Sequence, residues 1–140
     1  MDDCIFCKII NGAVPSSKVF EDEDFIAFLD IMPLNKGHTL VVPKKHCETI
    51  DDMPEQILAK IGPALKTLSR AVAAAAGATG VNLILSNGKT AGQLVPHFHF
   101  HIIPRREGDG LHFDTHRKKY AGNEMEQYRD KIISARTAKG

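Results

Sequence analysis

Apolar side chains recur along this chain with two periods, and the longer period predicts its helices. Residues 5–10 carry apolar side chains near helical spacing up to the Asn11-Gly12 pair, a good helix end, so we expect a short N-terminal helix. Residues 53–77 repeat apolar side chains at intervals of three and four up to a final glycine, which predicts one long helix. Pro63 lies inside that segment and predicts a kink or break near Gly62, because proline lacks the amide donor and crowds the preceding turn.

The shorter period predicts strands. Apolar runs bounded by turn residues indicate strands at residues 17–21, 25–30, 38–43, 81–88 and 97–103, and the acidic turn EDED joins the first two as a hairpin. A weakly amphipathic stretch, residues 123–135, indicates a second helix near the C-terminus. These elements predict an α+β fold with a sheet of about five mainly antiparallel strands covered by the long helix. They leave the strand order open.

Length, charge and cysteine number narrow the class of protein. We expect a single domain over residues 1–140, with a core to about residue 104 and a tail over residues 105–140. A net charge of +1 is too small to predict a nucleic-acid partner, although a small charged ligand remains possible. Charges interrupt the apolar runs near the N-terminus, so we expect no export signal or membrane span, and a cytoplasmic location. Three cysteines argue against a disulfide framework and favour metal binding or burial.

The segment HFHFHII, residues 97–103, places three histidines at every second position of a predicted strand. Because side chains alternate across a strand, the rings of His97, His99 and His101 project from one face, at successive separations of roughly 6.5–7 Å, and could reach a shared centre. Three interpretations follow: solvated histidines without a function, a three-histidine metal site that activates water, or one imidazole acting as a nucleophile.

The nucleophile interpretation places specific demands on the ring. Histidine titrates near pH 6.5, so much of it is neutral at pH 7 and carries a nitrogen lone pair that can attack phosphorus. The other ring nitrogen must donate a hydrogen bond to a fixed acceptor, such as a backbone carbonyl, to aim that lone pair.

The CIFC segment places Cys4 and Cys7 where the first helical turn could present both thiols to one ion. A redox pair is the alternative, but such a motif normally follows a strand in a βαβ unit rather than beginning a chain. Two buried thiols without a ligand are the other alternative.

Several segments in this order resemble the histidine triad (HIT) family of nucleotide hydrolases and transferases, and in particular its small bacterial members with a zinc site. They are CIFCKII, FLDI, GHTLVVPKKH, AGQ, HFHFHII and HIIPR. The resemblance implies the HIT-like fold and a homodimer joined through sheet edges. It also implies attack by His99 on the α-phosphorus of a purine nucleotide conjugate, such as an adenylate, through a nucleotidyl-histidine intermediate. AMP or an adenylate conjugate would be the ligand, and nucleotide phosphoramidates or dinucleoside polyphosphates would be the substrates.

The resemblance also assigns roles to individual residues. Asp30 would bind the ribose, and His101 would contact the phosphate or the leaving oxygen. Asn87 and Gln93 would contact the phosphate or the ribose side, although loop capping is the alternative from the residues alone. The slot for the base would be formed by four apolar side chains that otherwise read as core: Phe6, Ile9, Phe28 and Ile31. A structural zinc ion would be held by Cys4, Cys7, His46 and His97.

Other residues are left outside the site. We expect that Cys47 is not a ligand, that His38 belongs to a loop, and that the cluster Arg105, Arg106, Arg117, Lys118 and Lys119 is a solvated face, with phosphate contact as the alternative. No role is predicted for His112 and His116.

One position departs from the family pattern. Many relatives carry Ser or Thr after the glutamine, and this chain has Leu94. The missing hydroxyl puts phosphoramidate cleavage in doubt more than nucleotide binding. An alternative function is therefore a zinc-stabilised, purine nucleotide-binding regulatory module with little turnover.

Overall fold

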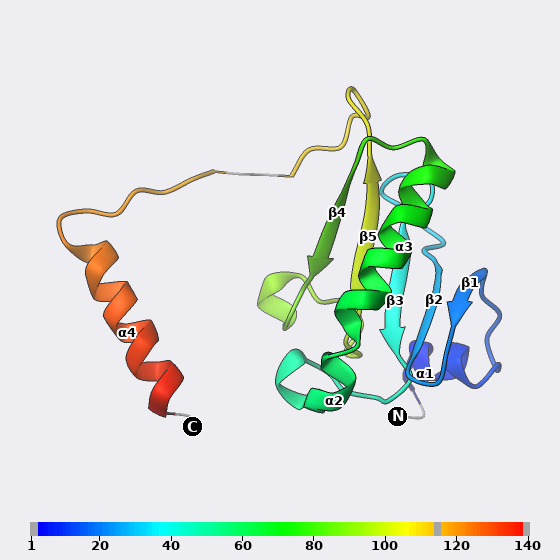
Figure 1. The fold of residues 1–140 in the computed structure, drawn as a ribbon, viewed down its shortest axis with the longest axis horizontal. Coiled ribbons are helices and arrows are strands. Elements are labelled where there is room, and N and C mark those ends of the chain that lie inside the picture. The colour runs from blue at the N-terminus through cyan, green and yellow to red at the C-terminus, as the bar shows by residue number, and fades with distance from the viewer. Residues whose placement is uncertain (1–2, 114–115, 139–140) are drawn as a thin grey trace.

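The structure, a computed structural model, describes residues 3–113 and 116–138. Its centre is a five-stranded sheet in the order β1-β2-β3-β5-β4, in which every neighbouring pair is antiparallel. The strands are β1 (Lys18–Glu21), β2 (Phe25–Leu29), β3 (Thr39–Pro43), β4 (Gly80–Leu85) and β5 (Phe100–Arg105). The long helix α3 (Ile61–Ala76) covers one face and the short helix α1 (Ile5–Ile10) packs on the other (Figure 1). The predicted α+β fold is confirmed.

Alternation along the strands separates two apolar layers. On the α3 face, Ile61, Leu65, Leu68 and Val72 form the buried stripe of the helix, and they pack against Phe25, Ala27, Val41 and Ile102. On the α1 face, Phe6 packs with Ile26, Phe28, Leu40 and Val42. Because successive side chains of a strand point to opposite faces, each central strand contributes to both layers.

The predicted long helix is two helices. A single turn, α2 (Glu55–Leu58), is followed by two turn residues, and α3 begins at Ile61. Pro63 therefore lies in the first turn of α3, where its missing amide hydrogen leaves no acceptor unpaired. The predicted break near Gly62 is confirmed, and it lies at Ala59 and Lys60. α3 ends as predicted at Gly77, whose φ of 61° is the left-handed conformation typical of helix C-termini.

The strand that carries the histidines is displaced from its predicted bounds. Ladder pairing begins at Phe100 and runs to Arg105, so His97 and His99 precede β5 and only His101 lies in it. The amide of Phe98 donates to the carbonyl of Cys47 at 2.7 Å in place of a ladder bond. The alternation nevertheless survives, since Phe98 packs in a cluster with Cys47 and Met53 while the histidines face α1 and the pocket.

The strand before the histidines, β4, has other bounds than predicted. The C-terminal region contains the expected helix. β4 covers Gly80–Leu85 instead of residues 81–88, and short 3-10 turns occupy Ile50–Asp52 and Lys89–Ala91. The tail contains α4 (Glu124–Ala138), which lies apart from the sheet beyond β4 (Figure 1). Among the described residues, no helix has the length and apolar character needed to cross a membrane. The core and tail boundaries at 104 and 105 stay a prediction.

The core layer under α3 generates a stability prediction. Ile102 is fully buried there, so we expect Ile102→Ala to lower the free energy of unfolding by roughly 2–5 kcal/mol through lost apolar burial and the remaining cavity. The same substitution at Ile31, which is 94% exposed, should change it by less than about 0.5 kcal/mol. Urea denaturation at one fixed protein concentration measures both. Equal losses in the two variants would contradict the placement of Ile102 in the core.

Candidate active site and metal centre

A pocket of about 320 Å³ lies between α1 and the sheet. It contains all four side chains predicted for the base slot, together with Asp30, His99 and His101. Phe6 and Phe28 are buried and meet edge to face with ring centroids 5.6 Å apart, whereas Ile31 stands at the exposed rim. The volume and the mostly apolar lining with a few polar groups are typical of a small-molecule site.

His99 is held in the orientation that a nucleophile requires. Its Nδ1 lies 2.7 Å from the backbone carbonyl of His97, so Nδ1 carries the hydrogen and donates it. This leaves Nε2 as the lone-pair nitrogen of a ring that lines the pocket. Burial lowers the pKa of His99, against the opposing effects of the carbonyl bond and of Asp30, and therefore favours the neutral ring.

His101 is held in the opposite tautomer. The amide of Leu34 donates to Nδ1 of His38 at 3.2 Å, so the hydrogen of that ring must sit on Nε2. Nε2 of His38 then donates to Nδ1 of His101 at 2.9 Å, which leaves Nε2 of His101 as an N–H donor. Burial, followed by the nearby rings of His99 and His38, lowers the pKa of His101 to about 4. The pocket therefore contains one lone-pair imidazole and one donor imidazole.

His38 is a site residue that the sequence prediction left in a loop. It directly precedes β3 and is 3% exposed. It lies two residues before Leu40, which lines the pocket, so its side chain faces the same side of the sheet. Gly37, at φ +99°, adopts the left-handed conformation of the turn that delivers it, with the His38 amide bonded to the Asn35 carbonyl at 3.0 Å. Counting alternate positions back from Leu40 would have found it.

Asp30 follows β2 and faces the same group of rings. Its Oδ1 accepts from the amide of Met32 at 2.8 Å, and its Oδ2 lies 3.8 Å from Nε2 of His38. Asp30, His38 and His101 thus bring three possible ligand atoms together. The tautomer of His38 argues against a metal here, because its Nε2 carries a hydrogen and has no lone pair to offer.

The structure uses Asn87 and Gln93 to hold loops together. Oδ1 of Asn87 accepts from the amide of Ile50 at 2.8 Å. Gln93 accepts from the amide of Gly88 at 2.7 Å and donates to the carbonyls of Glu48 and Val95 at 2.7 and 3.0 Å. Neither residue lines the pocket. The geometry matches the loop-capping alternative, and their predicted contact with a nucleotide stays a prediction.

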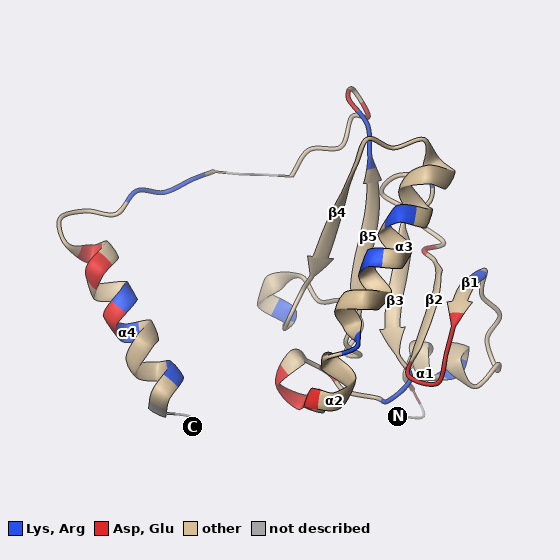
Figure 2. Ribbon diagram, viewed as in Figure 1, with Lys and Arg blue, Asp and Glu red and all other residues tan. Residues whose placement is uncertain are grey.

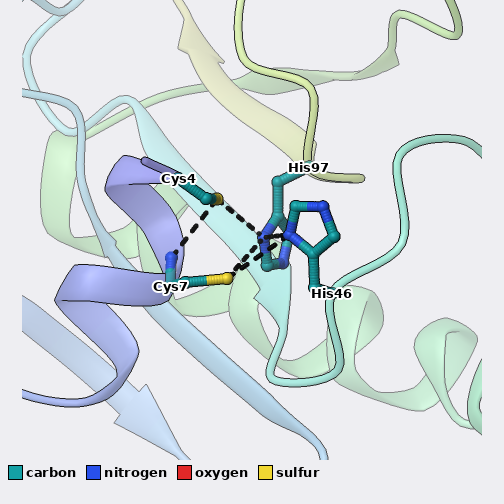
Figure 3. Close-up of side chains that lie close together, drawn as sticks. All are labelled: Cys4, Cys7, His46 and His97. Atoms are coloured by element: carbon teal, nitrogen blue, oxygen red, sulfur yellow. Dashed lines mark hydrogen bonds between the residues drawn. The ribbon is translucent and has the colours of Figure 1, made fainter. Parts of the chain in front are cut away.

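Four side chains from three separate segments form a second cluster (Figure 3). Cys4 and Cys7 come from the start of α1, His46 from the loop after β3, and His97 from the segment before β5. The Sγ atoms of Cys4 and Cys7 lie 3.3 and 3.7 Å from Nδ1 of His97, and the two Nδ1 atoms of the histidines are 3.2 Å apart. All four ligand atoms lie within 4.8 Å of one another.

These distances suit a tetrahedral ion. Zn–S and Zn–N bonds of about 2.3 and 2.0–2.1 Å place the ligand atoms of a tetrahedron roughly 3.3–3.8 Å apart. Nε2 of His97 donates to the carbonyl of Pro43 at 2.8 Å, which aims the Nδ1 lone pair at the cluster. Burial and the neighbouring Cys4 raise the pKa of the Cys7 thiol, so a cation is the natural counterpart for its thiolate. Two thiols and two imidazoles are a common zinc donor set.

The three histidines of HFHFHII therefore do not share one centre. His97 belongs to the cysteine cluster, His99 is held by a carbonyl, and His101 is held by His38. The three-histidine metal alternative does not fit this geometry, because ladder pairing begins only at Phe100 and the His97 ring turns toward α1.

Residues predicted to lie outside the site are placed as follows. Cys47 bonds through Sγ to the carbonyl of Asp52 at 3.4 Å and is not part of the cluster. Arg105 donates to Asp109, Asn82 and the carbonyl of Leu111, so it anchors the loop after β5 and is not simply a solvated side chain. The other four residues of the basic cluster are exposed, as is His112.

Comparisons with known proteins agree with this geometry. The HIT domain model matches residues 11–108. The protein hit of Bacillus subtilis is 40% identical over 134 residues, 94% of this chain and 92% of that protein. An adenosine 5'-monophosphoramidase of Schizosaccharomyces pombe is 42% identical over 102 residues, 73% of this chain and 74% of that protein. An adenylylsulfatase of Arabidopsis thaliana is 42% identical over 110 residues, 79% of this chain and 56% of that protein.

Solved structures are similar over nearly the whole chain. A Streptococcus mutans protein superposes with a TM-score of 0.91 at 40% identity, over 96% of this chain and 86% of that one. A histidine triad nucleotide-binding protein of Candida albicans gives 0.87 at 31% identity, over 99% and 100%. A zinc-bound histidine triad family protein of Mycobacterium smegmatis gives 0.74 at 34% identity, over 98% of each chain. The chain therefore belongs to the histidine triad (HIT) family and is close to its bacterial Hit proteins.

Proposed function

We propose that this protein is a nucleotide hydrolase or transferase that cleaves purine nucleotide conjugates at the α-phosphorus, with His99 as the nucleophile. The observation that carries the proposal is the bond from Nδ1 of His99 to the carbonyl of His97, which leaves the other ring nitrogen free in an apolar pocket. The relatives that act on an adenosine phosphoramidate and on an adenylyl sulfate support the substrate class.

The pocket suggests how a nucleotide lies. The base would enter the slot of Phe6, Ile9, Phe28 and Ile31, and the free lone pairs of Asp30 would accept the ribose hydroxyls. This arrangement leads the α-phosphate toward His99 and His101, which line the same pocket. Binding would thereby convert attack on phosphorus into a reaction between positioned neighbours.

The two tautomers divide the chemistry of the first step. Nε2 of His99 forms a bond to phosphorus while the bond from phosphorus to the leaving group breaks, and the leaving group takes its proton from water. Nε2–H of His101 donates a hydrogen bond that stabilises the charge developing on the phosphate or the leaving atom. The nucleotidylated ring carries a positive charge, which the carbonyl of His97 stabilises through Nδ1–H. In the second step water attacks phosphorus and gives its proton to solvent while the bond from phosphorus to Nε2 of His99 breaks, which restores the neutral His99 ring.

Leu94 favours a second candidate function. It lines the pocket at a position where many relatives offer a hydroxyl, and its side chain is 93% exposed. A leaving group would find no hydrogen-bond donor from this residue. A zinc-stabilised nucleotide-binding module with little turnover is therefore the alternative, and turnover separates the two functions.

Zinc is the metal that we propose for the cluster of Cys4, Cys7, His46 and His97. The donor set and the ligand spacing support it, as does similarity to a zinc-bound family member. When bound, the ion would supply a structural cross-link between α1, the loop after β3 and the segment before β5. It would hold His97, whose carbonyl orients His99.

We further propose a homodimer that joins its sheets through β4. This strand forms one edge of the sheet and is longer than β1, the other edge, and its Leu83 is 46% exposed. Three free thiols fit a reducing compartment, and a cytoplasmic location stays a prediction.

Removing the nucleophile tests the reaction. We expect His99→Ala to lower kcat on adenosine 5'-phosphoramidate by at least about 10³-fold, with AMP binding nearly unchanged by calorimetry. Intact-mass analysis of wild type after a rapid neutral quench should show one adenylyl adduct, and the variant should show none. Full activity in the variant would refute the mechanism. Binding without turnover in wild type would establish the regulatory module instead.

Metal analysis tests the zinc centre independently of activity. We expect one equivalent of zinc per chain in purified wild type, and less than a tenth of that in Cys7→Ser, because a hydroxyl is a far weaker zinc ligand than a thiolate. Cys47→Ser is the matched control, since Cys47 is also buried and next to His46 but lies outside the cluster. Metal retained in Cys7→Ser, or lost equally in Cys47→Ser, would contradict the assignment.

Two substitutions of His38 test whether it acts through its hydrogen bond to His101 or only by filling space. His38→Leu removes the donor to His101, and we expect kcat to fall about 10–100-fold with a much smaller change in KM. His38→Gln keeps an N–H near the position of Nε2 and should restore part of that loss. Equal kcat values for the two variants would show that the ring acts only by filling space.

A further inference from the structure

The turn that delivers His38 begins at Asn35. The amide of His38 donates to the carbonyl of Asn35 at 3.0 Å, and Gly37 between them is left-handed, which closes a four-residue turn. The amide of Leu34 donates to Nδ1 of the His38 ring. The main chain and the ring of His38 are thus held by two adjacent residues, and the position of this pair determines how the ring is held.

The side chain of Asn35 fastens this turn to the strand that carries His101. Its Nδ2 donates to the carbonyl of Pro104 at 2.9 Å and to Oδ2 of Asp109 at 3.0 Å, which uses both amide hydrogens. Pro104 lies three residues after His101 in β5, so the first bond joins the turn directly to that strand. The turn, the end of β5 and the loop that follows it lie at the same end of the sheet (Figure 1).

Asp109 is a charged acceptor with little exposure. Its side chain is 5% exposed and accepts from Nε of Arg105 at 2.8 Å and from the amides of Arg106 and Leu111 at 3.1 and 3.0 Å. Charged residues of both signs lie in this loop after β5 (Figure 2). The bond from Arg105, followed by those from the two amides, holds the pKa of Asp109 well below its usual range. The carboxylate therefore stays charged, and its bond with Asn35 is charge-assisted.

Hydrogens can be distributed over the rings of His38 and His101 in two ways. In the first arrangement, which the Leu34 amide imposes, both rings carry hydrogen on Nε2, and that of His101 remains available to the pocket. In the second arrangement both hydrogens lie on Nδ1, so that His101 donates to His38 and Nδ1 of His38 no longer accepts from Leu34. Nε2 of His101 then has a lone pair and offers no donor to a phosphate. Asp30 also favours the first arrangement, but its Oδ2 lies 3.8 Å from Nε2 of His38, beyond hydrogen-bond distance.

We propose that Asn35 and Asp109 are positioning residues, which select the first arrangement by holding the turn before β3 against β5. Neither residue lines the pocket, so their effect on the reaction passes through His38. The inference rests on the proposed function and deepens it, because it names residues outside the pocket that determine whether His101 donates to the phosphate.

Ring ¹⁵N spectroscopy of the full-length protein tests this selection without any need for turnover. Long-range ¹H–¹⁵N spectra distinguish a ring nitrogen that carries hydrogen from one that has a lone pair. We expect wild type to carry hydrogen on Nε2 of both His38 and His101, and Asn35→Ala and Asp109→Ala to show a mixture of the two arrangements. Asn82→Ala is the matched control and should keep the wild-type pattern. Asn82 is also half-buried and accepts from Arg105 at 2.8 Å, but it lies in β4, on the other side of β5 from the turn.

Kinetics on adenosine 5'-phosphoramidate measure the consequence. We expect Asn35→Ala to lower kcat about 10-fold with KM changed less than about twofold, since the loss affects the donor and not the base slot. The double variant with Asp109→Ala should fall no further than Asn35→Ala alone, because the two side chains act through one bond. Asn82→Ala should keep kcat within about twofold of wild type.

The outcomes separate this role from a structural one and from the reaction itself. Wild-type ring signals in folded Asn35→Ala and Asp109→Ala, the same mixture in Asn82→Ala, or unfolding of both network variants would overturn the proposal. A wild type that binds AMP without turnover would remove the proposed reaction, whereas the ring spectra would still decide whether the two residues select the tautomer. Turnover in wild type together with unchanged rings in the variants would remove the positioning role alone.

Discussion

The hydrogen bond from Nδ1 of His99 to the carbonyl of His97 is the interaction on which the site depends. It sets the tautomer of the proposed nucleophile. It also links two centres through a single residue, because the side chain of His97 lies in the cysteine cluster while its backbone holds His99. A displacement of His97 would change the aim of His99 without any substitution in the pocket. His97 thus connects the cysteine cluster with the proposed nucleophile.

The two catalytic candidates differ because their neighbours differ. His99 is buried and His101 half-buried, and both belong to one short segment, yet a carbonyl holds the first and another imidazole holds the second. The amide of Leu34 begins the chain of bonds that ends at His101, so the turn before β3 determines which nitrogen of His101 carries a hydrogen. This division lets one pair of identical side chains supply both a nucleophile and a hydrogen-bond donor.

Much of this arrangement is predictable from local sequence, and the rest depends on long-range contacts. Alternation of period two predicts which side chains of HFHFHII share a face, and the spacing of CIFC predicts that two thiols lie together. Alternation could not show that the ladder begins only after His99 or that His97 turns toward α1, because the carbonyl of Cys47 and the packing of Phe6 decide this. The loop contacts of Asn87 and Gln93 also depend on distant residues, since Ile50 lies 37 residues from Asn87 and Glu48 lies 45 residues from Gln93.

Helix α1 is the first element of the chain, and its contacts come from near the end of the core. Phe6 packs edge-on to His97 and His99, and Cys4 meets a partner 93 residues away. A nascent chain cannot form these contacts until the segment before β5 has left the ribosome. Cys4 consequently stays without its His97 partner during that interval, although Phe6 can already pack on β2 and β3.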